Sequence, residues 1–186
     1  EHLPFEEVNY WKELVNLIEE AKLKCASTLG LCWAGFAMAY MAGVEKNIFN
    51  KKLFGVYPMR SLVPGHSLMG TQDDEFFCPQ SRHAGLPDIE MEKAEKEGKL
   101  RLLAHGEKVG YTIFETPDQR QLMHLGHPEY NVDRLKSEMD RDKKRGDVPP
   151  PENFDLTKSN TSWRSHRNLL FQQWLWFCYQ HVSLSV

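Results

Sequence analysis

Cys32 stands at a position that favours nucleophilic chemistry. It follows a short apolar run at 28–31 that predicts a buried strand, and it precedes an apolar run at 33–42 that predicts a helix. A side chain at a sharp turn from strand to helix is held away from the backbone. The N–H groups and partial positive charge of the following helix favour a thiolate over a thiol. We therefore take Cys32 as the candidate nucleophile, although an isolated cysteine in an apolar run is more often a small buried hydrophobe.

His127 and Glu129 form a second candidate pair, directly after a predicted strand at 120–125. Pro128 biases His127 toward extended backbone, in which residues i and i+2 point the same way. Glu129 could then orient the imidazole while the ring faces a nucleophile. A solvated loop is the competing interpretation. Other pairings are also open, through His66, His83, His105 and Glu138.

The predicted elements would bring these residues to one edge of a sheet. A helix at 6–24, the strand at 28–31 and the helix at 33–42 follow the order typical of a parallel α/β sheet. The carboxyl ends of parallel strands gather at one edge, so Cys32 and His127 could meet there. Further strands are expected at 51–58, 100–104, 109–114 and 120–125, the last three as an antiparallel meander. A long irregular stretch is expected after 58, helices at 132–144 and 163–179, and the last helix is expected to lie mostly in the core.

Composition narrows the class of protein. With 186 residues, 41% of them hydrophobic, the chain suits one domain with one sizeable core. A net charge of −3 gives no reason to expect nucleic acid as a partner, and no apolar run has the length of a membrane span. The four cysteines form no C-x-x-C pair, which argues against a metal site and fits a reducing cytoplasm. No phosphate-binding or dinucleotide motif indicates a bound cofactor.

Several blocks of the sequence, in this order along the chain, resemble one family. They are Ser27 to Ala34, Lys52 to Tyr57, Asp73 to Phe76, Pro79 to His83, Gly126 to Tyr130 and Ser162 to Phe171. Together they are similar to the homoserine O-succinyltransferase and O-acetyltransferase family of methionine biosynthesis. The resemblance implies a class I glutamine-amidotransferase-like, flavodoxin-like α/β sheet flanked by helices.

The same resemblance implies a Cys32–His127–Glu129 triad and ping-pong chemistry. The Cys32 thiolate would take an acyl group from acyl-coenzyme A, and His127 would deprotonate the amino-acid hydroxyl that receives it. The backbone N–H of Trp33 would serve the oxyanion. Lys52, Ser81 and Arg141 match substrate-binding positions of the family, whereas the pattern alone reads Lys52 and Arg141 as solvated surface charges. Phe36 stands where the family usually has Gln.

Glu1 matches the family position associated with the choice of acyl donor. A carboxylate there would repel the free carboxylate of a succinyl group, so we expect acetyl-CoA rather than succinyl-CoA as co-substrate. The family also implies a homodimer and a longer chain, so residues 1–186 are expected to be one α/β acyltransferase domain from its C-terminal portion. Its missing N-terminal segment would then be a partner.

Homoserine is the expected acceptor, and three alternatives stay open. L-serine is one methylene shorter, which separates substrates by only about 1–3 kcal/mol. A cysteine hydrolase or amidotransferase-like enzyme would release the acyl group to water. A non-catalytic binding subunit would not need Cys32.

Overall fold

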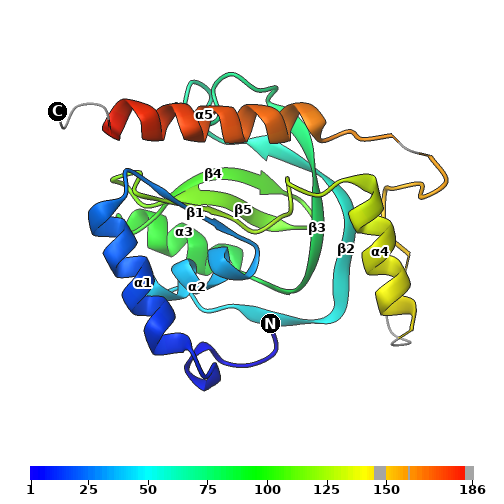
Figure 1. Cartoon of the computed structure of the whole chain (residues 1–186), viewed down its shortest axis with the longest axis horizontal. Helices are drawn as coiled ribbons and strands as arrows, with labels where there is room; N and C mark the ends of the chain where they lie inside the picture. The colour runs from blue at the N-terminus through cyan, green and yellow to red at the C-terminus, as the bar shows by residue number, and fades with distance from the viewer. Residues whose placement is uncertain (145–149, 159, 183–186) are drawn as a thin grey trace.

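The described part of the chain folds into one mixed sheet with helices on both faces. The computed structural model describes residues 1–144, 150–158 and 160–182. Its strands are β1 (Thr28–Leu31), β2 (Asn47–Ser61), β3 (Glu75–Gly85), β4 (Arg101–Gly106), β5 (Gly110–Glu115) and β6 (Gln121–His124). Its α-helices are α1 (Trp11–Lys24), α2 (Trp33–Met41), α3 (Asp88–Lys96), α4 (Val132–Lys143) and α5 (Arg164–Val182) (Figure 1). A short 3₁₀ helix at Phe5–Glu7 replaces the first turns of the helix predicted at 6–24.

The order of the strands across the sheet is β1-β6-β5-β4-β2-β3. β1 and β6 run parallel, with Leu31 opposite His124, whereas the other neighbouring pairs are antiparallel. The parallel arrangement predicted from the helix–strand–helix order is thus confined to β1 and β6. β4, β5 and β6 form the predicted antiparallel meander. The α/β class is confirmed, as a mixed sheet.

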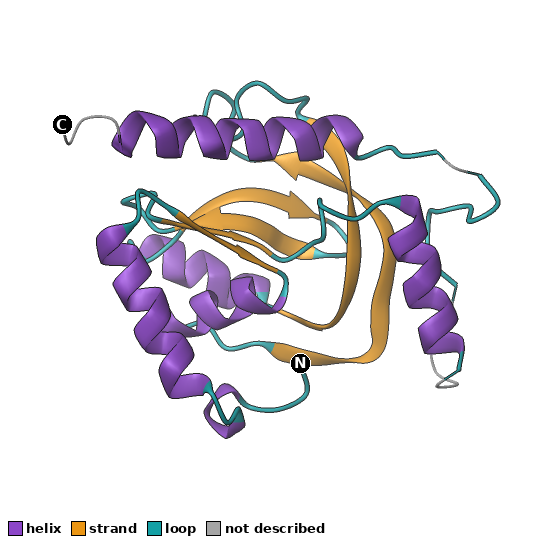
Figure 2. Cartoon of the chain, viewed as in Figure 1, coloured by secondary structure: helices purple, strands orange, loops and turns teal. Residues whose placement is uncertain are grey.

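Side chains along the central strands alternate between two cores. Leu102, Phe114 and Met123 pack with residues of α1, α2 and α3. Their chain neighbours point to the opposite face and pack with residues of α5; they are Leu103, Ile113 and Leu122. Figure 2 shows α1, α2 and α3 on one side of the sheet and α5 on the other. This alternation follows from the two-residue period of a strand.

The structure departs furthest from the prediction between residues 47 and 96. The predicted strand at 51–58 is part of a longer β2, and the stretch expected to be irregular contains β3 and α3. β2 and β3 pair antiparallel over most of their length. Pro79 lies within β3, where its missing N–H argued for a loop. β3 is the outermost strand of the sheet, and such strands tolerate proline.

The packing of α5 also differs from the prediction. Leu170 and Phe177 are buried, as expected, but Leu175, which was expected to lie in the core, is 59% exposed. α5 lies along one face of the sheet, and only one side of it can be covered by that face (Figure 1). None of the described helices combines the length and apolarity needed to cross a membrane.

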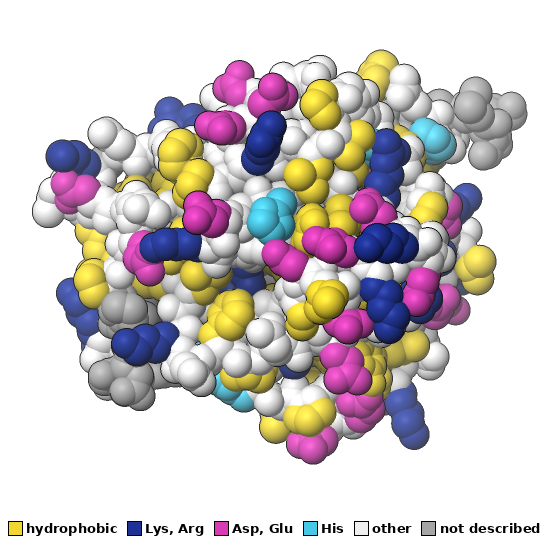
Figure 3. All heavy atoms as spheres, turned by 180° about the vertical axis from the view of Figure 1, so that it is seen from behind, with side chains coloured by type: hydrophobic (Ala, Val, Ile, Leu, Met, Phe, Trp, Pro, Cys, Tyr) yellow, Lys and Arg dark blue, Asp and Glu magenta, His cyan; other side chains and the backbone are white. Residues whose placement is uncertain are grey.

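Charges of both signs are interspersed on the face seen in Figure 3. Acidic side chains there lie beside basic ones, so the net charge of −3 is not gathered on that face as one acidic patch. Exposed pairs of this kind each contribute little to stability, in the range of about 0–1 kcal/mol.

Candidate active site

Cys32 occupies the sharp turn between β1 and α2. Its N–H donates to the His124 carbonyl at 2.8 Å, and its own carbonyl accepts from the Phe36 N–H at 3.1 Å. Its backbone has φ 47° and ψ −111°, which L side chains rarely adopt and which costs about 1–3 kcal/mol. Glycines allow the close approach of strand and helix, because a Cβ on Gly35 would lie 3.1 Å from the Gly30 carbonyl oxygen. The predicted strand-to-helix turn at Cys32 is confirmed.

The resting ionisation state of Cys32 differs from the expectation. Burial, together with the negative charge of Glu1, raises the pKa of the Cys32 thiol to about 12. The Arg82 charge and the Trp33 backbone N–H lower that pKa, so the start of α2 acts in the predicted direction. Desolvation is the larger effect, however, and the prediction of a favoured thiolate was wrong for the resting site. Cys32 is a thiol at neutral pH and needs a base to become a nucleophile.

Glu1 lies directly beside the candidate nucleophile. Its Oε1 accepts a hydrogen bond from the Cys32 Sγ at 3.7 Å, and its Oε2 accepts a short one from the His83 N–H. Lys46 holds this segment in place by donating to the carbonyls of Glu1 at 2.5 Å and Leu3 at 2.8 Å. A carboxylate is therefore fixed where a group attached to the Cys32 sulfur would extend.

His127 and Glu129 are joined as the sequence pattern predicts. The His127 Nδ1 and Glu129 Oε1 are 2.7 Å apart. The ring of Tyr130 stacks on the His127 ring with centroids 4.1 Å apart, and the His127 N–H donates to the Pro79 carbonyl at 2.8 Å. The imidazole is thus oriented by a carboxylate, by a ring face and through the backbone. This leaves its Nε2 as the nitrogen available for proton transfer.

Cys32 and His127 lie at the same edge of the sheet. Cys32 follows β1 and His127 follows β6, and these two strands are parallel neighbours in register. Among the described residues the Cys32 thiol donates to Glu1, and no hydrogen bond joins it to the His127 ring.

Lys52 and Ser81 lie in a buried polar cluster beneath α4. The Lys52 Nζ is 2.6 Å from Asp142 Oδ2 and 3.5 Å from Glu138 Oε2, and the Ser81 hydroxyl donates a short hydrogen bond to Glu138 Oε2. Burial opposes ionisation of Glu138. The Ser81 hydrogen bond, the Lys52 charge and a Tyr130 hydrogen bond nevertheless hold the pKa of the Glu138 carboxyl below its usual value. The interpretation of Lys52 as a solvated surface charge was wrong.

Arg141 completes this cluster at its solvent side. Its side chain is about half exposed, its Nε donates to Asp142 Oδ1 at 2.9 Å, and its Nη1 is 3.7 Å from Glu138 Oε1. The Tyr130 hydroxyl donates to the same Glu138 oxygen at 2.9 Å. Since Tyr130 also stacks on His127, one aromatic side chain links the cluster to the candidate base.

Three residues of the site were not assigned a role from the sequence. They are Arg82, Tyr130 and Asp142, whereas Glu138 was open as a member of an alternative pairing. Tyr130 and Arg82 belong to the blocks that carry the family resemblance, and this was the available signal for them. Asp142 follows Arg141 on α4, where an acid beside a basic residue gives no distinguishing pattern.

The other candidate histidines form contacts that do not include Cys32. His66 pairs with Glu115 at 2.8 Å, both buried, and His105 pairs with Asp88 at 2.9 Å near the surface. His83 contributes its backbone N–H to Glu1. Neither of the two acid–histidine pairs includes a cysteine.

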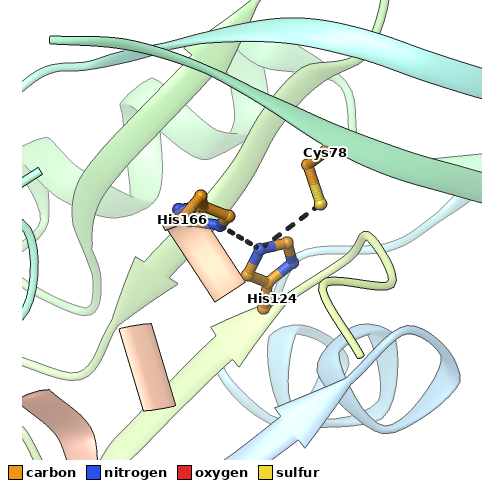
Figure 4. Close-up of side chains that lie close together, drawn as sticks. All are labelled: Cys78, His124 and His166. Atoms are coloured by element: carbon orange, nitrogen blue, oxygen red, sulfur yellow. Dashed lines mark hydrogen bonds between the residues drawn. The ribbon is translucent and has the colours of Figure 1, made fainter. Parts of the chain in front are cut away.

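Cys78, His124 and His166 form a buried group behind the His127 loop (Figure 4). The His124 Nε2 is 3.4 Å from the His166 Nε2 and 3.8 Å from the Cys78 Sγ. The Gly126 N–H donates to the His124 Nδ1 at 3.0 Å, so the proton of that ring is on Nε2. A protonated Nε2 has no lone pair for a metal ion. The geometry therefore favours a neutral hydrogen-bonded group, in keeping with the lowered pKa that burial gives both imidazoles.

Comparison with known families identifies the family to which this chain belongs. The sequence profile of the family described as homoserine O-succinyltransferase matches residues 1–184. The chain belongs to this family. Among its curated relatives, the homoserine O-acetyltransferase of Agathobacter rectalis is 37% identical over 190 residues, and the homoserine O-acetyltransferase of Bacillus subtilis is 36% identical over 189 residues. Each alignment covers 98% of this chain. The chain spans 60% and 62% of the length of these two relatives.

Solved structures show the same fold outside the family. A glutamine amidotransferase from Thermotoga maritima superposes with a TM-score of 0.68 over 98% of this chain and 75% of that one, at 14% sequence identity. A glutamine amidotransferase from Methylobacillus flagellatus gives a TM-score of 0.72 over 92% of this chain and 71% of that one, at 12% identity. The predicted glutamine-amidotransferase-like fold is thereby confirmed.

Proposed function

We propose that this chain carries the acyl-transfer site of a homoserine O-acetyltransferase. The observation that carries the proposal is the placement of Cys32, on its strained turn, at the same sheet edge as the His127–Glu129 pair. The acetyl group of acetyl-CoA would pass to the Cys32 sulfur and then to the hydroxyl of L-homoserine. Family membership and the names of the curated relatives support this choice.

In the first half-reaction, the His127 Nε2 accepts the Cys32 proton and the sulfur attacks the thioester carbonyl carbon. The Trp33 backbone N–H, which lowers the pKa of the Cys32 thiol, would donate to the developing oxyanion. The carbon–sulfur bond to CoA then breaks, and the CoA thiolate takes the proton from the imidazolium. In the second half-reaction, His127 accepts the homoserine hydroxyl proton while that oxygen attacks the acyl-enzyme. The proton then returns to the Cys32 sulfur as O-acetylhomoserine leaves.

The polar cluster supports an amino-acid acceptor. Arg141 keeps guanidinium N–H groups toward solvent and suits the acceptor carboxylate. Lys52 and Ser81 fix Glu138 and Asp142, so positive and negative groups stand close together, as a zwitterionic substrate requires. The donor is proposed to be acetyl-CoA because the Glu1 carboxylate occupies the space beside the Cys32 sulfur.

Intact mass spectrometry of the full-length protein tests the proposal. The protein is mixed with acetyl-CoA or succinyl-CoA without an acceptor, and the adduct is mapped by peptide digestion. We expect an acetyl adduct on Cys32 that is discharged by L-homoserine, and none in Cys32→Ser. An adduct on another residue would overturn the assignment of the nucleophile.

The other outcomes separate the alternatives. Continuous release of acetate without an acceptor would indicate a hydrolase. Discharge by L-serine with the higher kcat/KM would make serine the acceptor. A ligand-binding activity that Cys32→Ser leaves unchanged would indicate a binding subunit.

A further inference from the structure

His124 is a buried imidazole at the end of β6 that the acyl-transfer scheme above does not use. It contacts the backbone of both proposed catalytic segments. Its carbonyl accepts the Cys32 N–H at 2.8 Å, and its ring Nδ1 accepts the Gly126 N–H at 3.0 Å. Gly126 directly precedes His127, so one residue joins the turn of the candidate nucleophile to the loop of the candidate base.

The Gly126 N–H needs an acceptor within the protein. Gly126 is buried, and a buried N–H without a partner costs free energy and is rare. The loop passes close to β3, because a Cβ on Gly126 would lie 2.5 Å from the Gln80 Nε2 and 2.9 Å from the Pro79 carbonyl oxygen. The next N–H, that of His127, donates to the same Pro79 carbonyl at 2.8 Å. Two successive N–H groups therefore fix the backbone that carries the His127 ring, and the first of them does so through His124.

The ring of His124 is itself held in one orientation. Since its Nδ1 accepts, its Nε2 carries the proton and donates to the His166 Nε2 at 3.4 Å (Figure 4). His166 then carries its own proton on Nδ1, which donates to the Gln72 Oε1 at 2.6 Å. Donors and acceptors thus follow one direction from Gly126 to Gln72, with both rings as neutral imidazoles. This chain of hydrogen bonds connects α5, which carries His166, to the loop before His127.

We propose that His124 is a positioning residue for the proposed catalytic pair, whose ring holds the Gly126 N–H and so places the His127 imidazole relative to Cys32. This rests on the proposed function in taking Cys32 and His127 as the reacting pair. His124 exchanges no proton with the substrate or with the Cys32 sulfur in this scheme. It keeps the backbone between β6 and His127 in the conformation that the reaction needs. A displacement of a catalytic group by about 1 Å can lower the rate by about 100-fold.

Two substitutions separate the roles of the two ring nitrogens. In His124→Asn the amide oxygen reaches the position of Nδ1 and can still accept the Gly126 N–H. In His124→Gln the amide reaches the position of Nε2 and leaves the Gly126 N–H without this acceptor. We expect kcat for acetyl transfer by the full-length protein to fall about 10- to 100-fold in His124→Gln and less than about threefold in His124→Asn, with KM little changed in both.

His66 provides the matched control. Its Nδ1 accepts the Leu68 N–H at 3.2 Å, so this buried histidine makes the same contact with a backbone N–H two residues on, outside both proposed catalytic segments. His66→Gln should leave kcat near the wild-type value. Equal falls of kcat in His124→Asn and His124→Gln would overturn the proposal, because only one of them removes the acceptor. An unchanged kcat in His124→Gln would overturn it too.

Amide hydrogen exchange at Gly126, followed by NMR in the full-length protein, tests the positioning contact without acyl transfer. We expect exchange at least about tenfold faster in His124→Gln than in the wild type, and near the wild-type rate in His124→Asn. Equal exchange rates in the wild type and His124→Gln would overturn the proposal. A failure of the proposed function would show separately, as the lack of an acetyl adduct on Cys32.

A last measurement uses the wild-type protein and does not depend on the variants folding. The chain of hydrogen bonds requires the Nε2–H tautomer at His124 and the Nδ1–H tautomer at His166. Nitrogen NMR of histidine-labelled protein distinguishes these tautomers, and we expect both at neutral pH. The Nδ1–H tautomer at His124 would overturn the proposal, because a protonated Nδ1 cannot accept the Gly126 N–H.

Discussion

Cys32 combines a strained backbone with a buried thiol whose pKa is raised above the value usual for cysteine. The two properties serve the same end if the sulfur is needed as a nucleophile only when a thioester is bound. Until then the proton stays on sulfur, with Glu1 as its acceptor. In the proposed mechanism, His127 activates the thiol, and its ring is oriented by the contact with Glu129.

The Glu129→Gln variant tests that orientation. The amide can still contact the His127 Nδ1, but it does not stabilise the imidazolium and it permits the wrong tautomer. We expect kcat for acetyl transfer to fall by about 10²- to 10⁴-fold with little change in KM. Steady-state kinetics of the full-length protein provide the measurement, with Glu107→Gln on the β4–β5 turn as control. A variant with near wild-type kcat would remove Glu129 from the mechanism.

The Glu1→Gly variant tests the choice of acyl donor. Removing the carboxylate beside the Cys32 sulfur should admit a succinyl group, whose own carboxylate it repels. We expect the ratio of kcat/KM for succinyl-CoA to that for acetyl-CoA to rise at least about tenfold, or about 1.4 kcal/mol. Glu6→Gly, on the neighbouring 3₁₀ helix, should leave the ratio unchanged. A ratio that did not move would show that Glu1 does not select the donor.

The sequence analysis identified the candidate residues that a local sequence pattern marks. Cys32 stands between an apolar strand and an apolar helix, and His127 and Glu129 are two residues apart, so their placement follows from the chain itself. Glu138 and Arg82 form hydrogen bonds with residues distant in sequence, Ser81 and Val109 respectively. The direction of the Cys32 pKa shift was missed for the same reason, since it depends on burial that only the folded chain produces.

At the scale of elements, the approach of β1 to α2 sets the Cys32 turn. A Cβ on Gly30 would lie 2.5 Å from the Met38 Sδ and 3.1 Å from the Ala34 carbonyl carbon. We expect Gly30→Ala to destabilise the protein by about 1–3 kcal/mol, measured by urea unfolding. The double variant Gly30→Ala/Met38→Ala should be less destabilised than the sum of the two single variants. Additive losses would mean that the two side chains do not compete for this space.

Lys52, on β2, forms buried ion pairs with Glu138 and Asp142 on α4. Lys52→Met would leave Asp142 and Glu138 without their buried cation, and removing one partner of such a pair costs about 3–5 kcal/mol. The unfolding free energy in urea should fall by about that amount, whereas Lys51→Met, at an exposed neighbour, should change it by less than about 0.5 kcal/mol. Equal stability of the two variants would show that the Lys52 contacts contribute nothing.

The elements themselves were predictable where periodicity is strong. The α2, α4 and α5 helices and the β4–β6 meander lie close to their predicted places. β3 was not predicted, because Pro79 and Gly85 read as breakers and its partners in β2 lie from 15 to 38 residues away, from Arg60↔Glu75 to Asn47↔Gly85. The solvent-exposed side of α5 was not predicted either, since its apolar residues are distributed around the helix and do not indicate which side the sheet covers.

For the whole molecule, the group around His166 makes stability depend on pH. Burial lowers the pKa of His166 to about 4, from about 6.5 for the unfolded chain. As pH falls from about 6.5 to about 4, the unfolded state binds a proton that the folded state does not. The free energy of unfolding therefore decreases, by up to about 3 kcal/mol near pH 4, and it is unaffected by this group above pH 6.5.

The variant His166→Gln should flatten part of that dependence. We expect the unfolding free energy, followed by urea titration from pH 7 to 4, to decline by about 3 kcal/mol less than in the wild type. His105→Gln, outside this group, should retain the wild-type decline. A decline that is identical in His166→Gln and the wild type would mean that this imidazole is protonated as readily in the fold as outside it.

β1 sits at the end of the described sheet, with β6 as its one lateral neighbour there. The proposed nucleophile therefore follows a strand whose outer edge pairs with no other described strand. A polypeptide that paired along this edge, whether from the same chain or another, would restrain the turn at Cys32.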